Sequence, residues 1–278
     1  MNLPKKQFTL DFAGQPVSLT ISPMAEQANA AVLGQHGDTA VLVTVTLGKE
    51  DRNIDYFPLV VDYEEKFYAA GKIIGSRFIR REGRPSEEAV LSGRLIDRSL
   101  RPLFPKHLRR DVQIIITVLS YDEENDPEFI ALLSASAALA ISETPWEGPV
   151  AGARVAVKKD GAVIINPKNS ELKQKEDVSI ETFVSGTEET VNMIELGGNE
   201  AHEAEALRAF GTAQAEIKKL IQFIKSVAKD CGKKKIEVPE PAENLELKRK
   251  LLNFLKDKIE NALYQKDKTE RLEDLAEI

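Results

Sequence analysis

Residues 127–142 limit the possible folds of this chain more than any other segment. They read PEFIALLSASAALAIS, and the stretch from Phe129 to Ile141 is the longest nearly apolar run in the sequence. The run is too short to cross a lipid bilayer and contains Ser134 and Ser136, so we expect a helix buried inside the protein. Its small Ala and Ser side chains suit close contact with a β-sheet. The fold must therefore place a sheet directly against this helix.

Strand patterns occur on both sides of the predicted helix. Alternating apolar residues, separated by turn-forming residues, indicate hairpins. Ala40–Val43 is apolar on both faces, which is typical of a central strand. The predicted strands are 8–12, 17–21, 30–33, 39–47, 59–63, 111–120, 152–157, 162–165, 178–184 and 191–196, and a long amphipathic helix is predicted over 201–230. Together they predict an α+β fold with a mixed β-sheet packed by helices.

The composition changes near the C-terminal end. Gly232–Pro241 has the Gly, Lys and Pro content of a linker. The following stretch, Leu245–Tyr264, is expected to be strongly helical, with an apolar stripe that requires a partner. We therefore predict a first domain over residues 1–238 and the start of an all-helical domain over residues 239–278. Because the chain stops soon after the stripe, we expect this second segment to be truncated.

Positive charge is concentrated between Gly71 and Arg110. This segment holds 11 Lys and Arg against 4 Asp and Glu, a net charge of +7, whereas the whole chain carries −7. An acidic protein that gathers its positive charge in one segment is expected to use it on a polyanion. RNA and DNA are the first candidates, because the phosphate backbone is bound mainly through Lys and Arg.

The basic segment contains a loop followed by a helix. Ser86 is the predicted N-cap of the helix, which should run to about Leu100 and stop before Pro102. The loop carries Arg77, Arg80, Arg81 and Arg84, and the helix places Arg94, Arg98 and Arg101 within a stripe about 60° wide. The alternative is that these arginines are solvated or ion-paired, since Asp97 is placed to pair with Arg94 or Arg101.

Several classes of site and location are disfavoured. The three histidines are scattered, and His202-Glu203 lacks the second histidine of a zinc-protease helix, so we predict no metal site. No Walker loop is present, and the single cysteine, Cys231, has no histidine placed for thiol catalysis. One cysteine allows no internal disulfide, and the N-terminus lacks the apolar core of a secretory signal. We expect a cytoplasmic protein with no membrane role.

The acidic loop Tyr121–Glu128 has two interpretations. Its carboxylates could hold Mg²⁺. Alternatively, Asp126 caps the buried helix, Pro127 takes the first helical position and Glu128 follows in the first turn. We favour the cap, which has a consequence for ligands. A helix N-terminus occupied by its own carboxylates is a poor phosphate site.

Several motifs resemble those of the bacterial polynucleotide phosphorylase family. They are Tyr68–Ile73, Phe78–Ser86, Arg94–Arg98 and Arg101–Phe104, supported by Gly37–Val41 and Ala135–Leu139. The likeness extends over essentially the whole chain, and the arginine block is its most specific part. The resemblance implies that residues 1–238 form the first of two RNase PH-type domains and that residues 239–278 begin the helical domain between them.

The same resemblance implies an activity and partners. In this family three chains form a ring with a central channel, and single-stranded RNA enters it. Inorganic phosphate then degrades the RNA from 3′ to 5′ and releases nucleoside diphosphates. The implied partners are single-stranded RNA, further copies of the chain in a homotrimer and other proteins of RNA degradation, in mRNA turnover. Mg²⁺ is the implied cofactor, with its ligands outside this chain.

Residues 78–81 resemble the loop that constricts the family's channel. The resemblance implies that Arg80 and Arg81, with Phe78, contact RNA. It also implies that Arg84, Arg94, Arg98 and Arg101 contact phosphates or support RNA binding electrostatically. The family usually has two phenylalanines before the paired arginines, and here Ile79 replaces the second. Base stacking should be weaker at that point, since Ile has no π-face.

The resemblance also implies that this chain holds no catalytic residues. The family's working centre lies in its second repeat, with a serine-rich phosphate turn and two aspartates and a lysine around Mg²⁺. The corresponding turn here is Asn125–Phe129, which contains no serine and is acidic. Glu181 and Phe183 stand where a catalytic aspartate and lysine would fall, and Phe cannot stabilise developing charge.

Three hypotheses about function remain open at this point. The first is the N-terminal part of a phosphorolytic 3′–5′ exoribonuclease that threads RNA and supports the ring. The second is a non-catalytic module for RNA binding or assembly. The third is a self-sufficient nuclease of the RNase PH type.

Overall fold

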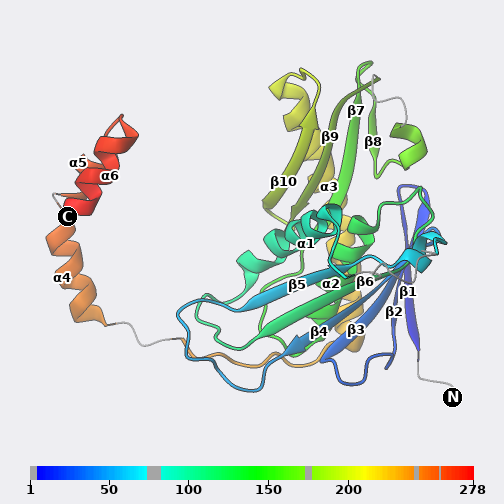
Figure 1. The fold of residues 1–278 in the computed structure, drawn as a ribbon, viewed down its shortest axis with the longest axis horizontal. Coiled ribbons are helices and arrows are strands. Elements are labelled where there is room, and N and C mark those ends of the chain that lie inside the picture. Colours follow the sequence, from blue (N-terminus) through cyan, green and yellow to red (C-terminus); the bar gives the residue numbers. More distant parts are fainter. Residues whose placement is uncertain (1–4, 74–82, 173–176, 241–243, 257) are drawn as a thin grey trace. The chain divides into compact units, whose positions relative to one another are not determined.

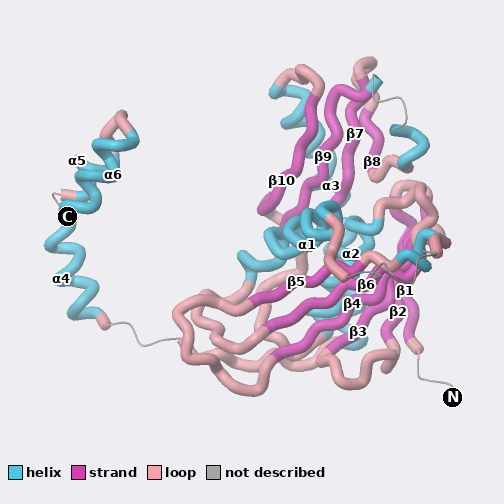
Figure 2. The backbone as a smooth tube through the Cα atoms, in the orientation of Figure 1, coloured by secondary structure: helices cyan, strands magenta, loops and turns pink. Residues whose placement is uncertain are grey.

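The chain divides into two compact units, Met1–Val238 and Pro239–Ile278. Their boundary lies at the residue predicted for the domain boundary. The computed structural model describes residues 5–73, 83–172, 177–240, 244–256 and 258–278. The first unit contains two β-sheets, and Figure 2 shows them as separate groups of strands.

The larger sheet contains six strands in the order β1-β2-β3-β4-β6-β5. They are β1 (Lys6–Phe12), β2 (Gln15–Ile21), β3 (Ala30–His36), β4 (Thr39–Leu47), β5 (Leu59–Glu64) and β6 (Val112–Ser120). All neighbours are antiparallel except β5 and β6, which run parallel. This sheet confirms the predicted hairpins, the internal position of β4 and the mixed character of the sheet.

The smaller sheet contains four antiparallel strands in the order β10-β9-β7-β8. They are β7 (Ala151–Lys158), β8 (Val163–Ile165), β9 (Val178–Gly186) and β10 (Val191–Gly198). The strands were predicted, but their separation from the larger sheet was not. Strand patterns reveal which face is apolar and do not reveal which distant strands pair.

Three helices of the first unit join the sheets. They are α1 (Glu87–Leu100), α2 (Pro127–Ile141) and α3 (Glu203–Cys231). Helix α2 packs on β3 and β4 and also contacts β7, α3 covers β7 and β9, and α1 lies on β5 and reaches β10 (Figure 1). Every residue of α2 from Phe129 to Leu139 is buried, which confirms the predicted buried helix.

The close contact of α2 with the larger sheet depends on Gly34. A Cβ atom at this position would lie 1.9 Å from Ser134 Oγ and 2.9 Å from Ile130 Cγ1. Both distances are far below van der Waals contact, so only glycine lets β3 approach the helix this closely. The small residues of α2 and the glycine of β3 thus form a matched pair of surfaces.

The first unit ends in a segment that is hydrogen-bonded to the C-terminus of α2. The backbone N–H of Lys233 donates to Ile141 O, and that of Ile236 donates to Glu143 O. The Lys235 ammonium donates to Leu139 O at 2.6 Å and to Ser142 O at 2.8 Å, which satisfies carbonyls left open at the helix end. The predicted linker is therefore attached to the first unit along this part of its length.

The second unit contains α4 (Leu245–Leu255), α5 (Ile259–Leu263) and α6 (Lys268–Glu277). The helical stretch predicted over 245–264 is present as α4 and α5. The leucines of its stripe remain about half exposed, with Leu251 at 49% and Leu252 at 61%.

None of the helices in the described part of the chain combines the length and the apolar character needed to cross a bilayer.

Candidate functional site

The exposed side of α1 carries the basic surface that the sequence predicts. Ser86 caps the helix, with its Oγ accepting from the Ala89 N–H at 2.9 Å, as predicted. Leu95, Ile96 and Leu100 face the core, whereas Arg94 and Arg98 are exposed on the opposite side. The two guanidinium groups are one turn apart, as the i, i+4 spacing requires.

Arg101 is engaged within the protein. Its Nε and Nη2 donate to the two carboxylate oxygens of Asp97 at 2.6 and 2.7 Å, and Nη2 also donates to Leu59 O at 3.1 Å. Its guanidinium lies 5.9 Å from the centre of the Phe57 ring. The ion-pair alternative therefore describes Arg101: it forms a bidentate pair with Asp97 at the end of α1 and a further hydrogen bond to Leu59, the first residue of β5.

The remaining predicted RNA-binding residues belong to the loop before α1. Phe78, Arg80 and Arg81 lie outside the described residues. Arg84 is exposed and lines a groove of about 790 Å³ between α1, the end of β5 and the N-terminus of α2. The structure thus brings Arg84, Arg94 and Arg98 to one region around α1.

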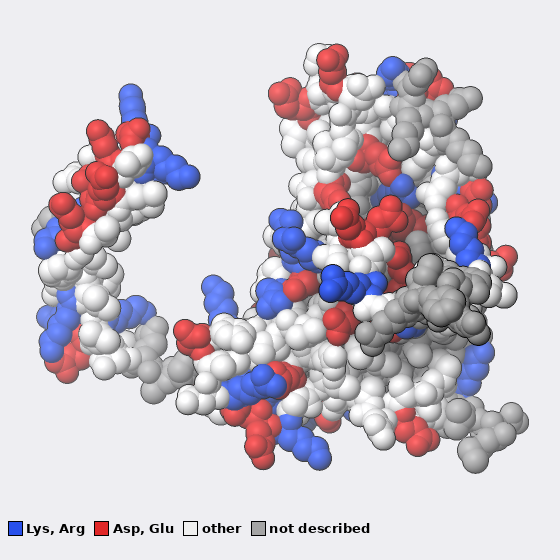
Figure 3. Space-filling view, in the orientation of Figure 1, with Lys and Arg blue, Asp and Glu red and all other residues white. Residues whose placement is uncertain are grey.

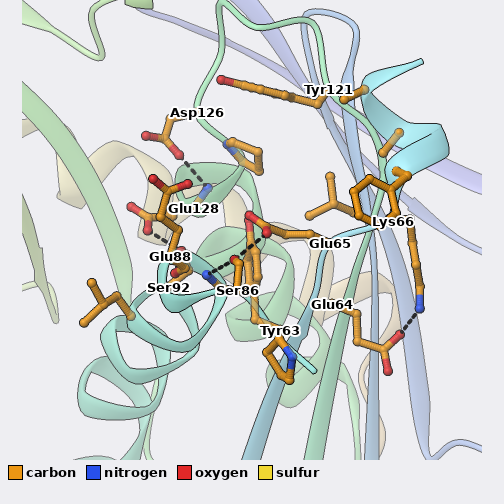
Figure 4. A pocket seen from close by; sticks show the side chains of 18 of the residues that line it. Tyr63, Glu64, Glu65, Lys66, Ser86, Glu88, Ser92, Tyr121, Asp126 and Glu128 are labelled. Atoms are coloured by element: carbon orange, nitrogen blue, oxygen red, sulfur yellow. Dashed lines mark hydrogen bonds and ion pairs between the residues drawn. The ribbon is translucent and has the colours of Figure 1, made fainter. Parts of the chain in front are cut away.

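The groove itself is acidic. Its described lining contains six carboxylates against three basic side chains: Glu64, Glu65, Glu88, Asp126, Glu128 and Glu195 against Lys66, Lys72 and Arg84. Figure 4 shows Asp126, Glu128 and Glu88 grouped at one end of the groove. In Figure 3, basic side chains lie over α1, and acidic side chains lie next to them toward β9 and β10.

The N-terminus of α2 explains why this groove repels anions. The Asp126 side chain accepts from the Glu128 N–H at 3.1 Å, and Pro127 takes the first turn, as the sequence predicts. Ser92 of α1 donates to Glu128 Oε1 at 2.5 Å. Burial and the neighbouring Asp126 carboxylate raise the pKa of Glu128 to about 7. Two carboxyl groups thus occupy the helix N-terminus that would otherwise suit a phosphate.

The acidic loop before α2 is internally bonded. The Asp122 carboxylate accepts from the backbone N–H groups of Asp38, Glu124 and Asn125. Although burial opposes ionisation, these hydrogen bonds lower the pKa of Asp122 to about 2. The Asp122 carboxylate therefore serves to shape the turn, in agreement with the non-metal interpretation of this loop.

A smaller pocket of about 210 Å³ lies beside the groove, over the face of the smaller sheet. Arg154 of β7 donates to Glu181 of β9, to Asp126 Oδ2 at 3.2 Å and to Asn169 Oδ1 at 3.1 Å. Phe183 is buried and lies opposite Arg154 in the strand register. Glu181 and Phe183 thus face one pocket, and an arginine already neutralises the carboxylate.

Mg²⁺ does not fit the residues present here. Across the described ranges, no group of three or more His, Cys, Asp or Glu side chains is arranged to hold a metal ion. The carboxylate that stands in the predicted catalytic position, Glu181, is paired with Arg154.

Comparison with known proteins identifies the family of this chain. Models of the 3′ exoribonuclease family match the chain twice, domain 1 over residues 13–145 and domain 2 over residues 148–216. The chain belongs to the 3′ exoribonuclease family. The first match spans most of the larger sheet with α1 and α2, and the second spans the smaller sheet and the first half of α3.

The chain is also similar to curated members of the family. It is 44% identical over 267 residues to polyribonucleotide nucleotidyltransferase of Finegoldia magna, with 96% of this chain and 37% of that protein covered. It is 49% identical over 227 residues to the same enzyme of Macrococcus caseolyticus, with 82% and 32% covered. The chain thus spans about 37% of the length of the Finegoldia relative.

A solved structure shows the same fold. The crystal structure of rice (Oryza sativa) Rrp46 matches with a TM-score of 0.61 and 16% sequence identity, over 77% of this chain and 94% of that one. At this identity the likeness establishes the RNase PH-like fold, which confirms the predicted fold class.

Sequence reasoning missed two features of the site. The first is Arg154, whose only signal is a charged residue within the apolar strand sequence AGARVAVK. The second is the contact of Ser92 with Glu128, which joins two helices 36 residues apart. Both depend on tertiary neighbours that no local pattern identifies.

Proposed function

We propose that this chain is the part of a phosphorolytic 3′–5′ exoribonuclease that guides single-stranded RNA toward a catalytic centre located outside it. The whole protein would use inorganic phosphate and Mg²⁺ to release nucleoside diphosphates from RNA in mRNA turnover. It would act as a homotrimer in the cytoplasm, together with other proteins of RNA degradation. The curated relatives named polyribonucleotide nucleotidyltransferase support this activity.

One observation carries the proposal for this part of the protein. Arg94 and Arg98 are exposed on a rigid, capped helix, and Arg84 lies on the loop before it. Guanidinium groups bind phosphate oxygens through paired, charge-assisted hydrogen bonds. Such contacts position the RNA backbone without reading its bases, so we expect little sequence preference.

The adjoining groove argues that the chemistry lies elsewhere. Phosphorolysis requires a bound phosphate and stabilisation of negative charge as it develops. Here the α2 N-terminus carries Asp126 and Glu128, and Phe183 offers no charge to a transition state. The geometry favours binding and steering over catalysis.

RNA binding by the longer, assembled protein tests the proposal. Two double variants reverse the charges, Arg80→Glu with Arg81→Glu and Arg94→Glu with Arg98→Glu. Single strands lose about 0.7 in salt slope per phosphate contact, so each pair should lower the slope by about 1.4. Arg208→Glu with Lys218→Glu, both exposed on α3, is the control matched for net charge. Unchanged affinity and slope in both pairs would refute the role of these arginines.

For the 278-residue chain by itself, the same acidic groove favours a non-catalytic RNA-binding module. An assay with poly(A), phosphate and Mg²⁺ separates this module from a self-sufficient nuclease. We expect no release of nucleoside diphosphate and retained RNA binding. Diphosphate release would overturn the assignment of this chain as non-catalytic.

A further inference from the structure

The smaller pocket contains more carboxylates than one arginine neutralises. Its lining includes Asp126, Glu128, Glu181 and Glu195, with Arg154 as the basic residue among the described lining side chains. In the strand register Arg154 lies opposite Phe183, and Phe183 lies opposite Glu195, so the three share one face of the sheet. The pocket is therefore a group of oxygen ligands around one cationic side chain.

The contacts of Arg154 resemble those of a bound cation. Its guanidinium reaches three oxygen-bearing groups from three different segments: the Glu181 carboxylate on β9, Asp126 Oδ2 at the start of α2 and Asn169 Oδ1 in the connection after β8. Carboxylate and amide oxygens are also the ligands that hard divalent cations prefer. The Arg154 side chain is only 15% exposed, so water screens these contacts weakly.

We propose that Arg154 is the built-in cation of this pocket, and that its guanidinium takes the oxygen ligands that a divalent metal ion would otherwise bind. The guanidinium thereby holds the α2 N-terminus, β9 and the segment around Asn169 together without a metal ion. This inference rests on the contacts of Arg154 and not on RNA binding, so it can fail independently of the proposed function.

Removing the charge of Arg154 should create a need for a metal ion. Arg154→Met keeps an unbranched apolar stem and leaves the carboxylates of Asp126 and Glu181 without a counter-charge. Loss of one partner of a partly buried ion pair should lower Tm by about 5–10 °C. Calcium is the best probe, because its coordination geometry is the most permissive among hard divalent cations.

Thermal unfolding of the 278-residue chain, with CaCl₂ compared against NaCl at equal ionic strength, measures this response. For a site with a Kd of about 1 mM, about 10 mM Ca²⁺ should restore roughly 3–5 °C to Arg154→Met. The wild-type Tm should not respond. Adding Glu181→Ala to Arg154→Met removes an oxygen ligand and should abolish the recovery.

Arg154→Lys keeps the proposal testable if Arg154→Met does not fold. Lysine retains the charge, so this variant should fold, unfold below the wild type and ignore calcium. If Arg154→Met is unfolded, circular dichroism should detect folding on addition of calcium. The proposal is overturned if calcium gives Arg154→Met no more stability than it gives the wild type, or if Arg154→Lys responds to calcium as strongly as Arg154→Met.

Discussion

The exposed face of α1 and the groove beneath it carry opposite charge within a few residues of each other. Arg94 and Arg98 lie on the outside of the helix, whereas Ser92, between them and the cap, points inward and donates to Glu128. An RNA backbone is attracted to the first surface and repelled from the second. In the proposed function, one helix therefore attracts RNA on its exposed face and presents an acidic groove on the other.

The largest effect is expected when the exposed arginines of α1 are replaced. Each charged hydrogen bond to phosphate contributes roughly 1.5 kcal/mol, so losing Arg94 and Arg98 together should weaken single-stranded RNA binding by about 100-fold at low salt. Arg94→Glu with Arg98→Glu in the assembled protein, measured by fluorescence anisotropy, provides the test. A loss no greater than that of Arg208→Glu with Lys218→Glu would show that α1 acts only through net charge.

The acidic groove can be examined through the pH dependence of the protein's stability. The folded-state pKa of Glu128 is about 7, above the ordinary glutamate value of 4.5. The folded state therefore binds more protons between these values, and stability falls as pH rises through this window, by up to about 3 kcal/mol. Glu128→Gln should remove this loss and unfold at higher temperature than the wild type at pH 8.

The pH dependence of the wild type alone does not isolate the effect of Glu128, because His36 also contributes to it. Burial lowers the pKa of His36 below 6.5, so its contribution to stability is lost as pH falls through the unfolded-state value. The two groups act in opposite directions. The difference between wild type and Glu128→Gln at each pH isolates Glu128, and a difference that does not change from pH 5 to 8 would contradict the raised pKa.

Asp126 joins the cap of α2 to the Arg154 cluster, and two substitutions separate these roles. Asp126→Ala loses the cap and the ion pair, and should cost about 2 kcal/mol in free energy of unfolding. Asp126→Ser keeps a good capping side chain and should lose only the part due to Arg154. Urea unfolding measures both. Equal losses would show that the cap contributes nothing.

The smallest effect is expected for the N-cap of α1, the helix that carries Arg94 and Arg98. Ser86→Ala removes the N-cap of α1 and should cost about 1 kcal/mol of stability. Because Arg94 and Arg98 lie two to three turns further on, RNA affinity should change little below the melting temperature. A large loss of affinity would indicate that the cap itself, or its Glu65 partner, orders the RNA-binding surface.

Local chemistry predicts much of this fold and fails where distant segments meet. Ser86 and Asp126 were predicted as caps because a cap is specified by the few residues that follow it. The buried α2 followed from its apolar, small-residue composition. The division into two sheets and the cluster around Arg154 were not predicted, since Arg154 meets Glu181 only through the pairing of β7 with β9.

The basic surface was predicted in part. The i, i+4 spacing placed Arg94 and Arg98 together, and the structure leaves both exposed. The same periodicity grouped Arg101 with them, but its side chain binds Asp97 and the carbonyl of Leu59. Periodicity gives the direction of a side chain from the helix axis and does not reveal which acceptors lie within its reach.

The segment that leaves the first unit has a mechanical consequence. Lys233, Lys235 and Ile236 are hydrogen-bonded to the last turn of α2 and the residues after it. Tension applied at Pro239 would therefore act on these bonds once the contact of Val238 O with His107 had opened. Such tension would break these hydrogen bonds before it loaded the β-strands. Asp126 caps the other end of the same helix. Helix α2 therefore carries the attachment of the following chain at its C-terminus and part of the groove lining at its N-terminus.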